Sequence, residues 1–176
     1  IGTTAAARAT PDANTLVFGT AGTMGTNHAL YKNPGFSIDD FDPIALFGTT
    51  PLAFVVSKDS PFRSVRDVID FAKKNPGKLT CATAGNGTIS HIACGMLQQM
   101  ANIQVDAVPY RSGSAAVIDV RGDRVSFLID VTPYLVPQIK DGAVRALAVT
   151  TTKRVSALPD VPTMSEAGVP GYEVFT

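Results

Sequence analysis

The sequence lacks several features that would mark common classes of protein. It contains no tryptophan and only two cysteines, and 15 basic residues balance 15 acidic ones. A nucleic-acid-binding domain normally carries a basic stripe, so the balanced charge argues against a nucleic-acid partner. No apolar run approaches the roughly 20 residues that a membrane-spanning helix needs. We therefore expect neither nucleic-acid binding nor membrane insertion.

The two cysteines, Cys81 and Cys94, are too few for a disulfide framework. They fall within one predicted strand–loop–helix unit, so a bridge between them is geometrically possible. Unoxidised cysteine is often buried, which favours free, packed thiols. No Cys/His spacing supports a metal site, and no Gly-Lys-Ser/Thr phosphate loop is present. The sequence therefore predicts no metal and no cofactor.

One pattern recurs three times: an apolar strand, a loop of small polar residues, and a helix. The predicted strands are 79–83, 105–108 and 124–130, and the loops after them begin at Ala84, Pro109 and Val131. Alternating strands and helices predict an α/β sheet with parallel pairing, which also includes a strand at 143–149. The carboxyl ends of parallel strands meet at one edge, where helix amino ends can hold an anion through backbone amides.

The flanks of this unit predict a second domain. A helix up to Ala9, a buried strand at 15–19, a loop at 20–26 and extended segments at 42–48 and 52–56 precede it. We expect a complete α/β domain at 57–148 and a partial first domain from 1–56 and 149–176. Hinge strands near 52–57 and 144–150 would link them. The first residues resemble the tail of a helix and the last an entering strand, so we expect a fragment of a longer protein.

Several short motifs occur in an order that is specific to one family. They are PGKL at 76–79, AGNGT at 84–88, VPY at 108–110, RALAVT at 145–150, ALPDVPT at 157–163, EAG at 166–168 and PGY at 170–172. The set closely resembles the Bug family, the periplasmic solute-binding receptors of tripartite tricarboxylate transporters. The resemblance implies an α/β fold of the type II periplasmic-binding-protein (Venus flytrap) class, with one complete domain and part of a second.

The resemblance also implies a function. It predicts a periplasmic receptor, with a signal peptide in the parent protein, that captures a small organic carboxylate. The receptor would pass this ligand to membrane permease subunits, without catalysis and without a cofactor. The sequence departs from the family at Arg111-Ser112, where a Lys-Gly pair is common, and in its two cysteines.

Asn86, Gly87, Thr88 and Ser90 are the foremost candidates for ligand binding. Two glycines in this loop allow close approach of the backbone to a ligand, and Thr88 places a hydroxyl where a carboxylate would sit at a helix start. The alternative for Thr88 is an ordinary helix cap. The adjacent His91 either contacts the ligand or closes the amino end of the helix.

The other two loops contribute further candidates. Tyr110, Arg111, Ser112 and Ser114 form the second loop, in which Arg111 either pairs with a carboxylate or stays a solvated charge at the rim. Asp130 ends an apolar strand, and it either accepts a hydrogen bond from a ligand or caps the next helix.

The predicted first domain supplies the remaining candidates, Ala21, Gly22 and Thr23. They would form the opposing wall of the site, unless the segment is a plain turn.

Two other classes of function remain open from the sequence. Ser90, His91 and Asp130 are the residue types of a hydrolytic set, but adjacent residues on a helix point apart and no Gly-x-Ser-x-Gly elbow is present. An effector-binding domain of a regulator can share this fold, and it would follow a DNA-binding helix-turn-helix in the parent protein.

Overall fold

The computed structural model describes residues 2–176 and divides into two compact units, Ile1–Gly48 and Thr49–Thr176. We call them unit 1 and unit 2. Among the described residues, the buried apolar core lies in unit 2, from Leu52 to Val174. Unit 2 is therefore the part of the chain in which a site can be built from packed elements.

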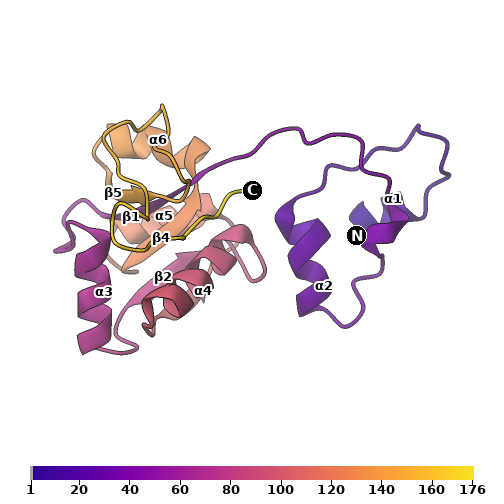
Figure 1. Ribbon diagram of the computed structural model, residues 1–176. Helices are drawn as coiled ribbons and strands as arrows, with labels where there is room; N and C mark the ends of the chain where they lie inside the picture. Colours follow the sequence, from indigo (N-terminus) through magenta and orange to yellow (C-terminus); the bar gives the residue numbers. More distant parts are fainter. Residues whose placement is uncertain (1) are drawn as a thin grey trace. The chain divides into compact units, whose positions relative to one another are not determined.

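Unit 2 contains a five-stranded mixed sheet in the order β3-β2-β4-β1-β5 (Figure 1). Its strands are β1 Leu52–Ser57, β2 Thr80–Thr83, β3 Asp106–Pro109, β4 Phe127–Val131 and β5 Val144–Val149. β2 pairs in parallel with β3 and β4, which confirms the predicted parallel pairing for these strands. β1 lies antiparallel between β4 and β5. The parallel pairing predicted for 143–149 is therefore wrong, because this strand hydrogen-bonds to β1 and not to a strand of the βαβ series.

Four helices cover the two faces of this sheet (Figure 1). They are α3 Val65–Lys74, α4 Ile89–Ala101, α5 Gly113–Arg121 and α6 Thr132–Lys140. α3 and α4 contribute to one apolar cluster with Phe54 and Phe127, whereas α5 and α6 contribute to a second cluster with Val55 and Leu128. Successive residues of a strand face opposite sides, so β1, β2, β4 and β5 each contribute to both clusters, whereas β3 contributes to neither.

The C-terminal segment (yellow in Figure 1) packs on the α4 side of the sheet. Met164, Tyr172 and Val174 are buried there, and the Val174 amide donates to the carbonyl of Thr150 at 3.1 Å. In this structure residues 149–176 thus belong to the same compact unit as the sheet. How the lobes of the whole protein divide, including the predicted assignment of 149–176 to a first domain, stays a prediction.

Unit 1 contains short helical segments and, among its described residues, no strand. The segments are α1 Gly2–Ala7, the π-helical η1 Ala21–Thr26, α2 Asn27–Leu30 and the 3-10 helix η2 Ile38–Asp40. The strand predicted at 15–19 is not formed, and Leu16 and Phe18 are each 72% exposed. A strand needs a partner for its backbone groups, and unit 1 provides none. The predicted loop at 20–26 is mostly η1, because Thr20 accepts from the Thr23 amide and caps it.

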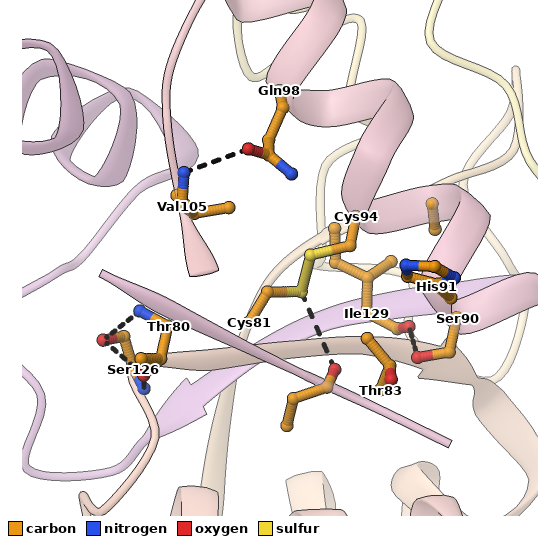
Figure 2. Close-up of a disulfide and its surroundings, with 12 residues drawn as sticks. Thr80, Cys81, Thr83, Ser90, His91, Cys94, Gln98, Val105, Ser126 and Ile129 are labelled. Atoms are coloured by element: carbon orange, nitrogen blue, oxygen red, sulfur yellow. Dashed lines mark hydrogen bonds between the residues drawn. A yellow bond between two sulfur atoms is a disulfide. The ribbon is translucent and has the colours of Figure 1, made fainter. Parts of the chain in front are cut away.

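Cys81 and Cys94 form a disulfide, so the expectation of free thiols is wrong (Figure 2). Cys81 lies in the buried strand β2, and Cys94 lies on the face of α4 that packs against it. Their Cα atoms are 6.5 Å apart, within the range that a disulfide spans. The sequence places both cysteines in one predicted strand–loop–helix unit. It does not specify how the helix is aligned on the strand, and therefore does not show whether the two side chains face each other. Among the helices of residues 2–176, none combines the length and the hydropathy that a membrane-spanning helix requires.

Candidate functional site

The three predicted loops lie together at one edge of the sheet in unit 2. β3, β2 and β4 are neighbours, and their carboxyl ends lie side by side because the strands are parallel. The Tyr110 amide donates to the carbonyl of Thr83 at 2.9 Å. A Cβ atom on Gly85 would lie 3.4 Å from the Tyr110 carbonyl oxygen. The loops that follow β2 and β3 are therefore in direct contact.

Hydrogen bonds within the first loop fix the start of α4. Thr88 is the N-cap: its hydroxyl donates to the Gly85 carbonyl at 2.7 Å and accepts from the His91 amide at 3.4 Å. The Gly87 amide donates to Nδ1 of His91 at 3.2 Å. Gly85 and Gly87 have φ values of +122° and +78°, which side chains rarely adopt. The loop thus depends on its glycines, and His91 closes it from the helix side.

Ser90 and Asn86 have different surroundings in this loop. Ser90 is buried, and its hydroxyl donates to the Ile129 carbonyl of β4 at 2.7 Å (Figure 2). Its side chain therefore anchors α4 to the sheet. Asn86 is exposed at the tip of the loop. The first amides of a helix have no partner within the helix, so this loop presents backbone donors as well as the Asn86 side chain.

The second loop directs its tyrosine along α5. The Tyr110 hydroxyl donates to Oδ2 of Asp119 at 2.7 Å, and Nε of Arg124 donates to Oδ1 at 2.8 Å. The hydrogen bonds from Tyr110 and Arg124 lower the pKa of Asp119, whereas burial and the Asp119 contact raise that of Tyr110. The Tyr110 hydroxyl is thus held by α5, and it is the main chain of Tyr110 that borders the first loop.

The remaining residues of this second loop are mostly open to solvent. Ser112 is the N-cap of α5, and its hydroxyl accepts from the Ala115 amide at 3.2 Å. Arg111 and Ser114 are exposed. At the start of α5, Arg111 and Ser114 are therefore exposed, and the exposed Ser112 uses its hydroxyl as the cap of the helix.

Asp130 is buried at the amino end of α5. The carboxylate accepts from the Tyr134 hydroxyl at 2.7 Å and from the Val131 amide at 2.8 Å, and the residue is only 4% exposed. A Cβ atom on Gly113 would lie 2.1 Å from Oδ2 of Asp130. Tyr134 is not among the predicted site residues, because it lies on α6 and Asp130 lies on β4, and their spacing in the sequence does not specify a contact across the turn between them. The third loop is therefore fixed by Asp130, Tyr134 and Gly113 acting together.

We expect Asp130 to make the stability of the protein fall as pH rises. Burial raises the pKa of Asp130, and the hydrogen bonds from Tyr134 and Val131 oppose this only in part. A raised folded-state pKa contributes stability below the unfolded value, and this contribution is lost as pH rises through the folded value. Asp130→Asn should therefore gain stability relative to the unmodified protein as pH rises from below to above the ordinary Asp pKa of 3.8. Urea unfolding of both proteins across this range measures the difference, and parallel curves would contradict it.

The hydrolytic arrangement considered above is not assembled. The Ser90 hydroxyl bonds to the Ile129 carbonyl, and Nδ1 of His91 bonds to the Gly87 amide. Asp130 bonds to Tyr134 and Val131 and not to His91. A nucleophile, a base and an orienting carboxylate must contact one another in series. Ser90, His91 and Asp130 do not make these contacts in the structure.

Ala21, Gly22 and Thr23 lie in η1 of unit 1, where Oγ1 of Thr23 accepts from the Thr20 amide at 2.9 Å. Their part in the site stays a prediction.

A surface depression of about 670 Å³ lies in unit 2 between the C-terminal ends of α5 and α6, lined by Lys58, Arg121 and Asp141 among others. The second and third loops precede the amino ends of these same helices, so the depression lies away from the candidate site.

Comparison with known proteins gives consistent matches. Residues 1–176 match the family model TctC, the tripartite tricarboxylate transporter family receptor. A UPF0065 protein of Pseudomonas sp. is 40% identical over 100% of this chain and 53% of its own length. The chain spans about half the length of the curated relatives it matches.

Two solved structures share the fold over almost the whole chain. The R. palustris protein Rpa4515 with adipate is 34% identical with a TM-score of 0.89, covering 99% of this chain and 60% of its own. The periplasmic binding protein BugD is 37% identical with a TM-score of 0.86, and the match covers 98% of this chain and 58% of BugD. These matches confirm the Bug resemblance and the periplasmic-binding-protein fold, with one complete α/β domain and part of another.

Proposed function

This chain belongs to the tripartite tricarboxylate transporter receptor family, and on that premise we propose that it captures a small organic carboxylate outside the cytoplasm and releases it unaltered. The observation that carries the proposal is the meeting of three strand–loop–helix turns at one sheet edge. Backbone amides at the start of a helix attract anions, because the helix dipole adds to their hydrogen bonds.

In this proposal the loop at 84–91 makes the main contact with a carboxylate. Gly85 and Gly87 allow the backbone conformation of the loop, Thr88 and His91 hold its shape, and Asn86 is exposed to bind. Arg111 and Ser114, exposed at the start of α5, add a charge and a hydroxyl next to it. Ser90, Tyr110, Ser112 and Asp130 act mainly by positioning these groups.

The class of ligand is proposed from relatives. The R. palustris neighbour holds adipate, a dicarboxylate, and the family is that of tricarboxylate transporter receptors. We extend the family's role to this chain: a periplasmic location and delivery to membrane permease subunits. The disulfide of Cys81 and Cys94 supports the location, since disulfides persist in oxidising compartments such as the periplasm.

A thermal-shift screen of organic acids on the full-length receptor tests the proposal. The panel comprises adipate, malate, succinate, citrate, benzoate and glutamate. A ligand at 100 times its dissociation constant adds about 2.7 kcal/mol of stability, enough to raise the melting temperature by several degrees. We expect at least one acid to do so and to be recovered unchanged afterwards. A panel without any response would overturn the proposal, and conversion of the acid would overturn its non-catalytic part.

Thr88→Ala is expected to weaken binding of the responding acid by about tenfold, because the loop loses the hydroxyl that joins Gly85 to His91. Ser64→Ala is the matched control. Ser64 caps α3 by accepting from the Asp67 amide, away from the three loops. Both changes should lower the free energy of unfolding by about 1 kcal/mol. Titration calorimetry should show weaker binding only for Thr88→Ala; equal affinities would move the site away from this loop.

A further inference from the structure

One stripe of α4 ties this helix to three adjacent strands. Ser90, Cys94 and Gln98 are spaced by four residues, so they lie on one face of the helix. Ser90 donates to the Ile129 carbonyl of β4, Cys94 is bonded to Cys81 of β2, and Oε1 of Gln98 accepts from the Val105 amide just before β3 (Figure 2). The attachment at Cys94 is covalent, and it lies between the hydrogen-bonded attachments at Ser90 and Gln98.

The covalent ring closed by this disulfide contains the whole first loop. Cys81 and Cys94 are 13 residues apart, and the segment between them runs through Gly85, Gly87, Thr88 and His91. Both cysteines are fully buried in the same apolar cluster as Leu97 and Phe127. The cross-link therefore joins the strand on which the loop begins to the helix on which it ends.

We propose that the Cys81–Cys94 disulfide is a positioning device for the anion-binding loop, so that the affinity of the receptor depends on the oxidation of this pair. The inference rests on the proposed function. Holding the first two turns of α4 fixed over β2 limits the arrangements that the loop amides can adopt. A site that is ordered before binding loses less freedom when a ligand arrives, and it binds more tightly for that reason.

Breaking the bond leaves the other ties in place but removes the constraint at the centre. The hydrogen bonds of Ser90 and Gln98 remain, and Tyr172 still donates to the Ala93 carbonyl at 2.7 Å. α4 should therefore stay folded on the sheet without the disulfide. The expected change is local: the loop at 84–91 opens more often, which amide exchange detects directly.

The test compares the oxidised full-length receptor with its double variant Cys81→Ala/Cys94→Ala. We expect amides at 85–90 to exchange about tenfold faster in the variant, and the responding acid of the panel to bind about tenfold more weakly. An excess of a dithiol, incubated long enough to reach the buried bond and itself oxidised to a disulfide, should convert the pair to two thiols, move the unmodified protein toward the variant and leave the variant unchanged. Val68→Ala is the control, since Val68 is equally buried but lies on α3. It should lower stability without either local effect.

The outcomes separate this inference from the function on which it rests. Equal exchange at 85–90 in oxidised receptor and double variant overturns the inference, whatever the ligand. Unequal exchange with equal affinity also overturns it, because the loop would then be restrained without consequence for binding. A panel in which the oxidised receptor binds no acid overturns the proposed function, and exchange still decides whether the disulfide restrains the loop.

Discussion

Replacing Gly113 by alanine is expected to lower the free energy of unfolding by about 3 kcal/mol. A Cβ atom at this position would lie 2.1 Å from Oδ2 of Asp130 and 2.2 Å from the Tyr134 hydroxyl oxygen. Neither atom can retreat freely, because each is the hydrogen-bond partner of the other and Asp130 is also held by the Val131 amide. The methyl group would therefore force α5 away from β4. Urea unfolding measures the loss.

Gly95→Ala is the matched control for this substitution. Gly95 lies in α4 and is exposed, and beyond its chain neighbours and the helix backbone no atom lies within 4 Å of the position of an added Cβ. Alanine should stabilise this helix by up to about 1 kcal/mol, because glycine costs more backbone entropy. Opposite signs for the two glycines would support the close packing of α5 on Asp130. A loss below about 1 kcal/mol for Gly113→Ala would contradict it.

Tyr172→Ala is expected to destabilise the protein by about 4 kcal/mol. Tyr172 is only 2% exposed, lies in the apolar cluster of the α4 face, and donates its hydroxyl to the Ala93 carbonyl. Burial raises its pKa above the ordinary tyrosine value. The substitution leaves a cavity under α4 and removes the contacts through which Tyr172 holds the C-terminal segment on this helix. Thermal and urea unfolding should show the loss in one transition with the rest of unit 2.

Tyr172→Phe separates the two contributions of this side chain. It keeps the ring in the cluster and removes only the hydrogen bond to Ala93, so a loss of about 1 kcal/mol is expected. If Tyr172→Ala lost no more than Tyr172→Phe, the ring would not be part of the core. The packing of the segment 163–174 on α4 would then be contradicted.

The sequence predicted the elements of unit 2 better than their arrangement. The spacing of Val65, Val68, Ile69 and Ala72 in the sequence is that of one helical face, and the structure has α3 there with Ser64 as its N-cap. The position of β1 could not be predicted, because an apolar run such as 52–56 does not specify its partners. β1 lies antiparallel between β4 and β5, and these pairings join residues far apart in the sequence.

Local spacing predicted the candidate site in part. It identified the loops that begin α4 and α5, and the structure places them against each other at one sheet edge. It did not predict that the Ser90 hydroxyl bonds to the Ile129 carbonyl or that the Tyr110 hydroxyl bonds to Asp119. These contacts depend on how the helices pack against the sheet, which local spacing does not specify. It also did not predict the disulfide, since the separation of Cys81 and Cys94 fixes neither the distance nor the facing of helix and strand.

The four-residue spacing on α4 has a consequence for how this segment can vary. Inserting or deleting one residue between Ser90 and Gln98 would turn one end of the helix by about 100° relative to the other. The attachments to β4, β2 and β3 could then no longer be made from the same side. Homologous chains that keep these three attachments should therefore differ within α4 by substitution only. Insertions and deletions should be confined to the segments before and after the helix.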